Sequence, residues 1–479
     1  MTTTTPTTAT TANLPVIIQG GMGVAVSSWR LAQAVAKRGH MGVVSGTAIE
    51  RVIACRLQEG DVGGHIRRVL AHCPLPELAA KVLATWFRPT GLPAPGFYDS
   101  LPMFAVEPNQ ELLELTVIAA FAEIALAKEA GGQVGINLLE KIPLPTLPVM
   151  YGAILAGVDW VVMGAGIPRD APGQLEALAA GKVATLRVPV EGGSTAQIPF
   201  DPAWFGTPNI PLKKPGFLAI VSSDVLALSL SRSGGIDGFI VEDACAGGHN
   251  APPRGGGTLD AKGEPVYGPR DKADLARMRK LGIPFWLAGG RATAEGLAQA
   301  KEAGAVGVQV GTAFAFCLES GLKPDLREEV LASIAAGEAS LFTDPNASPT
   351  GFPFKLVQHP GTIGGQDPEE RQRRTCSLGY LREAYAKPDG SVGWRCAAEP
   401  TAHYAAKGGD PADCAGCRCL CNGLLASVGH AHATSRNGDL EDPILTAGDD
   451  LRQLTRFIRK DRPYTADDVL DDLLSAPLP

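Results

Sequence analysis

Short apolar segments recur along the first two-thirds of the chain, and each ends in small or polar residues. Eight of them are apolar on both faces: residues 15–21, 41–46, 134–139, 160–166, 217–223, 238–244, 285–290 and 307–314. Strands of this kind are typical of a parallel sheet covered on both sides, since a half-exposed strand alternates apolar and polar residues. The pattern therefore predicts buried parallel strands.

The stretches between these segments have the features of helices. The segment at 27–40 begins with serines and ends near Gly39, and the segment at 293–305 begins at Thr293 and ends near Gly304. Ser and Thr are favoured N-cap residues, and Gly is favoured just after the last helical turn. Eight such strands with intervening helices predict an α/β fold, a (β/α)₈ TIM barrel, rather than an open doubly wound sheet.

Two connections are too long for simple crossovers. Residues 47–133 contain a long apolar helix pattern, and residues 183–216 contain a Glu-Gly-Gly run that predicts a β-hairpin. We expect both to be insertions around the barrel mouth, or a small lid. The barrel with these insertions is expected to span residues 14–345.

The two ends of the chain differ from the barrel in composition. Residues 1–13 are rich in Thr and are expected to be a disordered tail. Beyond residue 345 the periodicity fades, so residues 346–479 are interpreted as a C-terminal extension. This extension includes a Cys-rich segment at 376–421.

Composition excludes some partners. Of the 479 residues, 45% are hydrophobic and 19% are charged, and the net charge of -7 argues against nucleic acid or an anionic membrane as the main partner. No apolar run approaches the roughly 20 residues that span a bilayer. Because the N-terminus lacks the features of a signal peptide, we expect a cytoplasmic protein with mostly reduced cysteines or cysteines that bind a metal.

Glycines and small polar residues gather at the predicted strand ends. In a TIM barrel these ends meet at one mouth, where the active site forms. Bare backbone there lets N–H groups approach a flat ligand, and small residues before a helix suit a phosphate. Any one Gly pair can simply make a tight turn, but four at matching ends favour a phosphorylated planar cofactor. The residues singled out on this basis are Gly21, Met22, Gly23, Asn137, Ser222, Gly289, Gly290, Gly311 and Thr312.

One histidine is presented in an unusual way. In "EDACAGGHNAPPRGG", His249 follows Gly247 and Gly248, and two prolines stiffen the chain after it. An imidazole with a pKa of about 6.5 can exchange a proton near neutrality or hold an anion as imidazolium. The alternative is a structural histidine that bonds its own loop, which is how we interpret the other histidines.

Four separated motifs give this pattern a family resemblance. "PVIIQGGMG", "AGGH", "LAGGRAT" and "VGVQVGTAF", in this order within roughly residues 14–320, resemble the nitronate monooxygenase (2-nitropropane dioxygenase) family. The related flavin-dependent enoyl-acyl-carrier-protein reductases share the pattern. The resemblance implies a TIM barrel that binds FMN without a covalent bond.

The resemblance also implies roles for particular residues. The loop with Gly21, Met22 and Gly23 would pass near the isoalloxazine ring, with Gly248 beside it, and His249 would be the active-site histidine. The phosphate would be held by the amides of Gly289, Gly290, Gly311 and Thr312, and two further residues would contact the flavin: Asn137 and Ser222.

The sequence departs from the family beyond the histidine. Where nitronate oxidisers usually have Arg-Gly, this chain has "NAPPRGG", so Asn250 and Arg254 are candidates for anion binding, or the substrate differs. Tyr267 and Arg270 are either further mouth residues or part of a cap for the next helix through Asp271.

Cysteines cluster near residue 420. Cys414, Cys417, Cys419 and Cys421 have C-x₂-C-x-C-x-C spacing, with Cys376 and Cys396 upstream. Such thiols suit structural zinc or an iron–sulfur cluster, or else pack as small hydrophobic residues, and the metal is left unknown. The remaining cysteines are interpreted as core residues, with Cys245 close to His249: Cys55, Cys73, Cys245 and Cys317.

The resemblance implies an FMN-dependent oxidoreductase that oxidises alkyl nitronates with molecular oxygen. His249 would orient the anion or remove the α-proton of a neutral nitroalkane. One alternative is an NAD(P)H-dependent flavin enoyl-thioester reductase. An alternative of another class is a phosphate-binding barrel without redox function, such as an isomerase or a ligand sensor.

Overall fold

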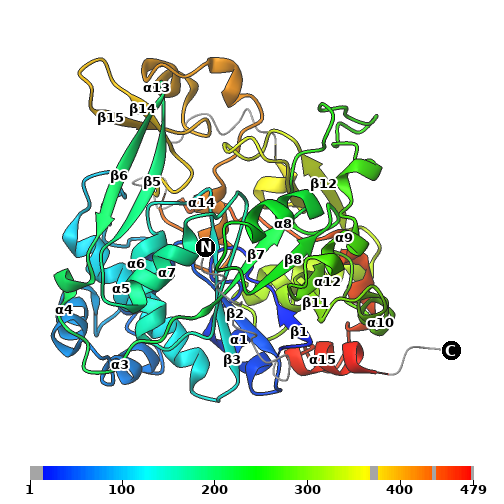
Figure 1. The fold of residues 1–479 in the computed structure, drawn as a ribbon, viewed down its shortest axis with the longest axis horizontal. Coiled ribbons are helices and arrows are strands. Elements are labelled where there is room, and N and C mark those ends of the chain that lie inside the picture. Colours follow the sequence, from blue (N-terminus) through cyan, green and yellow to red (C-terminus); the bar gives the residue numbers. More distant parts are fainter. Residues whose placement is uncertain (1–13, 367–375, 434–438, 476–479) are drawn as a thin grey trace, which may run out of the picture.

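A closed barrel of parallel strands forms the centre of the molecule (Figure 1). The computed structural model describes residues 14–366, 376–433 and 439–475, so the expected tail at 1–13 lies outside the described residues. The barrel order is β1-β11-β10-β8-β7-β4-β3-β2. Its strands are β1 (Ile17–Gln19), β2 (Met41–Ser45), β3 (Gln133–Leu139), β4 (Trp160–Gly164), β7 (Gly216–Val221), β8 (Gly238–Glu242), β10 (Phe285–Ala288) and β11 (Gly307–Val310). Each overlaps one predicted strand, which confirms the (β/α)₈ fold.

Apolar side chains fill the barrel. A buried cluster inside it is made of Ile18, Met41, Val43, Val162, Leu218, Ile240, Trp286 and Ala288. The Trp286 indole N–H donates to the Pro15 carbonyl oxygen at 2.7 Å, so the segment before β1 closes this end of the barrel. The interior is therefore a packed core, and a ligand has to bind at a barrel end.

Helices surround the barrel. They are α1 (Trp29–Ala36), α2 (Ile49–Gln58), α5 (Gln110–Lys128), α6 (Thr146–Leu155), α7 (Ala171–Ala179), α8 (Asp224–Ser231), α9 (Leu275–Lys280), α10 (Ala294–Glu302), α11 (Thr312–Ala315) and α12 (Pro324–Ala335). The predicted cap at Thr293 is present, since its side chain accepts from the Gly296 N–H at 3.0 Å. At α1 the predicted serine cap is absent. Glu123 of α5 instead accepts from the Trp29 N–H at 2.9 Å, which places a carboxylate at the positive end of that helix.

The two long connections have structure of their own. The first adds α3 (His65–Leu70) and α4 (Pro76–Trp86) to α2 and α5. The second forms the predicted hairpin, in which β5 (Ala184–Glu191) and β6 (Ser194–Phe200) are antiparallel. Its turn uses Gly192 and Gly193, both with φ near +100°, a conformation that favours glycine.

The C-terminal extension pairs with both the hairpin and the histidine loop. β14 (Glu383–Ala386) pairs with β5 and with β15 (Val392–Arg395), giving a four-stranded sheet beside the barrel (Figure 1). In a second sheet, β13 (Phe354–Gln358) lies between β12 (Ser340–Asp344) and β9 (Gly248–His249). The extension also contains α13 (Thr401–Ala406), α14 (Leu420–Ala426) and α15 (Ala466–Leu474).

Within residues 14–366, 376–433 and 439–475, no helix is both long enough and apolar enough to cross a bilayer. The long apolar helix α5 is buried against α6 and other helices of the barrel instead.

Candidate functional site

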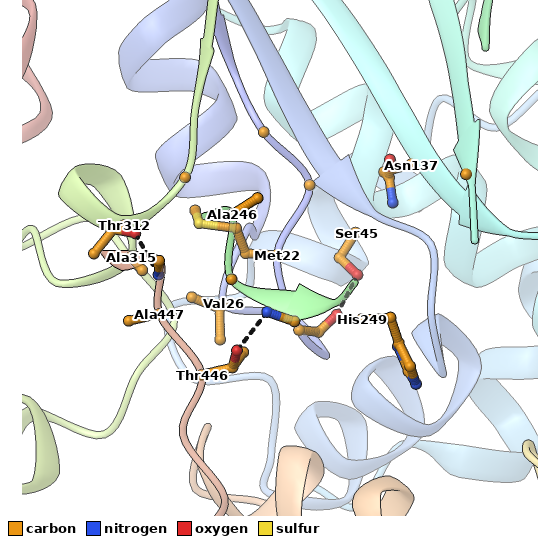
Figure 2. A pocket seen from close by; sticks show the side chains of 18 of the residues that line it. Met22, Val26, Ser45, Asn137, Ala246, His249, Thr312, Ala315, Thr446 and Ala447 are labelled. Atoms are coloured by element: carbon orange, nitrogen blue, oxygen red, sulfur yellow. Dashed lines mark hydrogen bonds between the residues drawn. The ribbon is translucent and has the colours of Figure 1, made fainter. Parts of the chain in front are cut away.

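A cavity of about 220 Å³ lies at the carboxyl ends of the barrel strands. Figure 2 shows side chains from the loop after β1, from β2 and β3, from the histidine loop and from the C-terminal extension around it. The structure brings almost all the predicted site residues to this cavity: Gly21, Met22, Gly23, Asn137, Gly248, His249, Gly289, Gly290, Gly311 and Thr312. Ser222 is the exception, because it lines a neighbouring cavity.

Buried polar contacts hold the loop after β1. The Ser27 hydroxyl donates to the Gly20 carbonyl at 2.9 Å and accepts from the Met22 N–H at 3.0 Å. A Cβ on Gly21 would lie 2.2 Å from the Cβ of Asn137, so only glycine allows these two segments to approach. The close approach of the loop after β1 to Asn137 is therefore a requirement of packing.

The opposite side of the cavity is the predicted phosphate end. Gly289 and Gly290, which follow β10, have φ of +92° and +62°, and Gly311 and Thr312 follow β11. Arg291 also lines the cavity, so a cation is present near these amides. The prediction missed Arg291, although it follows directly after the Gly pair in the sequence.

A segment from the C-terminal extension crosses the mouth, and we call residues 444–450 the C-terminal strap. The Gly248 N–H donates to the Thr446 hydroxyl at 2.6 Å, and the Gly448 N–H donates to the Thr312 hydroxyl at 2.9 Å (Figure 2). A Cβ on Gly247 would lie 2.7 Å from backbone of the strap. The strap therefore joins the histidine loop to the predicted phosphate end.

The strap also places acidic groups at the mouth. Asp450 lines the cavity, and burial raises the pKa of its carboxyl, although a hydrogen bond with Thr312 opposes this. Asp449 accepts from the Lys355 ammonium at 2.6 Å. The prediction missed the strap, because its sequence carries no motif and it lies about 200 residues from His249.

His249 is held from outside its own loop. Its Nε2 is 2.8 Å from the Ser348 hydroxyl, and its ring lies edge-on to Phe354, with centroids 4.8 Å apart. Burial, with a smaller contribution from the positive charge of Lys141, lowers the pKa of His249 to about 4. The imidazole is therefore neutral near pH 7, which disfavours the imidazolium role considered above.

A second cavity, of about 210 Å³, lies beside the first, and His249 lines both. Ser222 and Tyr267 line the second cavity, as does the exposed Arg254. Tyr267 donates to the Ala251 carbonyl at 3.1 Å, which ties it to the histidine loop. The candidate anion-binding Arg254 is therefore placed at this chamber rather than at the glycine-lined one.

Other residues of this loop have local roles. Asn250 is buried and donates to the Ala246 carbonyl at 3.0 Å, so it shapes the loop. Asp271 accepts from the Gly268 and Arg254 N–H groups, whereas α9 is capped by Asp274. Asp271 thus closes the loop as part of the capping box of a short 3-10 helix at Pro269–Asp271 and does not cap α9, and Arg270 lines neither cavity.

Glu242, at the end of β8, also lines both cavities. Burial raises the pKa of its carboxyl to about 7. The prediction missed this residue. The clue in the sequence was a lone acidic residue at the end of an otherwise apolar strand segment, "GFIVE".

The cysteines with C-x₂-C-x-C-x-C spacing do not form one cluster. Cys414 packs with Ala397 and Tyr404, with Cys417 alongside. A different set lines a small cavity of about 10 Å³: Cys376, Cys396, Cys419 and Cys421. Within the residues that the structure describes, no three His, Cys, Asp or Glu side chains are grouped in a way that could hold a metal ion.

The remaining cysteines lie in the interior or at its edge. Cys55, Cys73 and Cys317 are buried, as predicted, and Cys245 is half-buried. A Cβ on Gly289 would lie 2.9 Å from the Cys245 sulfur, so this thiol packs against the predicted phosphate turn. Burial raises the pKa of Cys245 to about 11, which keeps it protonated at neutral pH.

Comparison with known families and curated proteins supports a relationship for part of the chain. Residues 211–338 match the family model for nitronate monooxygenase. A nitronate monooxygenase of Pseudomonas aeruginosa is 32% identical over 132 residues, which cover 27% of this chain and 35% of that protein. One of Paraburkholderia phytofirmans is 28% identical over 201 residues, which cover 40% of this chain and 51% of that protein.

The chain therefore spans a third to a half of the length of these curated relatives. Among solved structures, FabK of Thermotoga maritima is 17% identical, with a TM-score of 0.47 over 96% of this chain and 92% of that chain. The nitroalkane oxidase of Streptomyces ansochromogenes is 15% identical, with a TM-score of 0.45 over 96% and 94%. The family-model segment includes His249, Gly289 and Gly311, and it confirms the predicted resemblance to the nitronate monooxygenase family.

Proposed function

We propose that the protein is an FMN-dependent oxidoreductase that converts small alkyl nitronates with molecular oxygen. The observation that carries the proposal is the meeting of the β1, β10 and β11 turns and His249 around one cavity. The match of residues 211–338 to the nitronate monooxygenase family supports the same activity.

The cavity has features that fit FMN. Glycines with positive φ leave backbone N–H groups uncovered at one end, which suits a phosphate, and Arg291 adds a positive charge. Gln309 lines the cavity, and its side-chain oxygen is buried without a hydrogen-bond partner among the residues that the structure describes. A ligand with N–H donors, as a flavin ring has, would satisfy this oxygen.

Asp450 lies at the proposed phosphate end. Burial raises the pKa of its carboxyl, and a phosphate beside it would repel the charged form and raise this pKa further. Its hydrogen bond with Thr312 also keeps the strap in place. The residues that we propose hold FMN are Gly21, Met22, Gly23, Asn137, Gly248, Gly289, Gly290, Gly311 and Thr312.

When bound, FMN would accept electrons from the substrate and pass them to molecular oxygen. The chain positions the substrate. A neutral His249, fixed by Ser348, can donate or accept one hydrogen bond at the nitronate, depending on its tautomer. Lys141, which lies 4.5 Å from the centre of the Phe352 ring, adds positive charge near the imidazole and so favours an anionic substrate.

The proposal is tested on protein purified after expression with added FMN. We expect absorbance bands near roughly 370 and 450 nm, which belong to the flavin itself. With propyl and 3-carboxyethyl nitronates we expect oxygen uptake and nitrite release. Absence of the bands would favour a barrel without redox function. Rapid anaerobic bleaching by NADPH without nitronate turnover would favour an enoyl-thioester reductase.

A further inference from the structure

The two cavities at the barrel mouth meet at a wall that contains Glu242. This residue ends β8, opposite Ala288 in the register with β10, and its side chain lines both chambers. His249 stands in the same wall. The glycine-lined cavity is the one that fits a cofactor, so the second cavity is the space left for a substrate next to both side chains.

Glu242 has no partner that would explain a structural role. Within the described residues, no side chain or backbone group is hydrogen-bonded or ion-paired with its carboxyl. Burial is the cause of its raised pKa. An unpaired acidic side chain in an apolar strand end costs free energy, and such groups concentrate at functional sites.

Other charged and titratable groups face Glu242 across the two chambers. In the second cavity they are Asp243, His249, Arg254, Tyr267 and Asp271. In the first they are Arg291, Tyr380, Cys421 and Asp450. None of these groups is a cause of the pKa shift of Glu242. Burial of the carboxyl, and not a neighbouring charge, therefore sets its pKa.

The two wall residues differ as bases. A base is most effective when its pKa lies near the working pH. The pKa of His249 is lowered to about 4, so its imidazole is a weak base, whereas that of Glu242 is raised to about 7. At neutral pH a substantial fraction of Glu242 is therefore ionised, and its carboxylate binds a proton more strongly than the His249 imidazole does.

We propose that Glu242 is the catalytic base that removes the α-proton of a neutral nitroalkane bound in the second cavity, while His249 positions the nitro group. This inference rests on the proposed function. In the step, the Cα–H bond breaks, the proton goes to a carboxylate oxygen of Glu242, and the electron pair moves into the nitro group. The product is the nitronate that the proposed oxidation consumes, and Glu242 then releases the proton to solvent.

The pH dependence follows from the protonation state that is required. Glu242 acts only as carboxylate, so the rate with a nitroalkane rises with pH through about 7. A nitronate supplied in its ionised form needs no base, so its oxidation does not show this rise. The difference between the two pH profiles therefore measures the ionisation of Glu242, and the pH dependence of the oxidation itself cancels.

The test compares nitroethane with ethyl nitronate in the wild type, in Glu242→Gln and in Glu176→Gln. Glu176 is an exposed carboxylate on α7 that lines neither cavity, so its variant is the matched control. In Glu242→Gln we expect kcat/KM for nitroethane to fall by about 100-fold or more, as for loss of a general base. For ethyl nitronate, which needs no deprotonation, we expect a loss at least about tenfold smaller than for nitroethane, and Glu242→Asp should regain part of the nitroethane activity.

A second readout does not depend on turnover. Infrared difference spectra of the wild type should show the carbonyl stretch of a protonated carboxylic acid that disappears as the pH rises through about 7. Burial also raises the pKa of Glu140 to about 7, so Glu242→Gln should lose only the Glu242 part of this signal, and Glu176→Gln should retain all of it. Thermal unfolding and flavin absorbance of each variant check that the fold and cofactor binding are intact.

Three outcomes overturn the inference and leave the proposed function standing. They are equal loss with both substrates in Glu242→Gln, no loss with nitroethane, and a wild type that oxidises nitronates but not nitroethane. A wild type that binds flavin and oxidises neither substrate refutes the proposed function, and the inference falls with it. A much larger loss with nitroethane than with ethyl nitronate, together with a weaker infrared signal in Glu242→Gln, supports the inference.

Discussion

The glycines of the barrel mouth make room for different neighbours. Gly21 leaves space for Asn137, Gly247 for the C-terminal strap, and Gly289 for the Cys245 sulfur. Gly248, with φ of +79°, has no atom within 4 Å of the position that a Cβ would take. Gly248 is thus explained by backbone conformation and open space, Gly21 and Gly247 by close packing, and Gly289, with φ of +92°, by both.

Replacing Gly21 by Ala tests this packing. The added Cβ would lie 2.2 Å from the Cβ of Asn137, and we expect Gly21→Ala to destabilise the fold by about 1–3 kcal/mol and to weaken flavin binding. Urea unfolding and flavin titration measure both effects. The control is Gly173→Ala in α7, where a Cβ meets nothing within 4 Å and Ala should leave stability unchanged or slightly higher. Equal behaviour of the two variants would contradict the packing argument.

At the scale of elements, the histidine loop is fixed by the C-terminal extension. β9 is only two residues long, yet β13 pairs with it on one side and the strap bonds it on the other. Ser348, which bonds His249, also comes from the extension. The barrel therefore supplies the cavity, and the extension sets the position of the imidazole.

The strap contact can be removed with a substitution of similar size. Thr446→Val leaves the Gly248 N–H without its acceptor, which we expect to cost about 1–3 kcal/mol and to weaken flavin binding. Thr446→Ser keeps the hydroxyl and should behave like the wild type. Fluorescence titration with FMN and thermal unfolding measure the two effects. Normal flavin affinity in the Val variant would show that the strap is not needed to shape the site.

At the scale of the whole molecule, the hairpin insertion and the C-terminal extension are joined in one sheet. Arg395 of β15 is buried, and its side chain bonds Glu383 at 2.7 Å and also Glu191 of β5. These contacts connect a segment that leaves the barrel after β4 with one about 200 residues later. The sheet is thus a further link between the barrel and the extension, apart from the strap and the pairing of β13 with β9.

Hydrogen exchange can test this link. In Arg395→Ala, two carboxylates lose a shared cation, and we expect amide exchange in β5 and β14 to become about tenfold faster or more, since bonds to charged groups contribute about 1.5–3 kcal/mol. Exchange in β11 should not change. Arg187, on the same hairpin, forms an exposed ion pair with Asp170 at the start of α7, and Arg187→Ala should have little effect. Uniform acceleration across the molecule would indicate global destabilisation instead.

The barrel could be predicted because local sequence carries its pattern. Runs apolar on both faces specify buried parallel strands, and Gly or Thr at their ends mark the turns. Since strand ends of a closed barrel meet at one mouth, residues as distant as Gly21 and Gly311 could be placed together from sequence. The strand pattern did not indicate that Ser222 lines the second chamber, since it cannot distinguish the chambers on the two sides of the Glu242 wall.

The sequence by itself thus determined the eight strands, the glycine turns and the histidine loop. The tertiary structure alone decided which cysteines meet, that the strap closes over Thr312, and that Glu242 faces both cavities. The physical reason is the range of the interactions. Strand and turn preferences act between neighbours in the chain, whereas the strap contacts and the burial that shifts the pKa of Glu242 and His249 arise only after distant segments pack together.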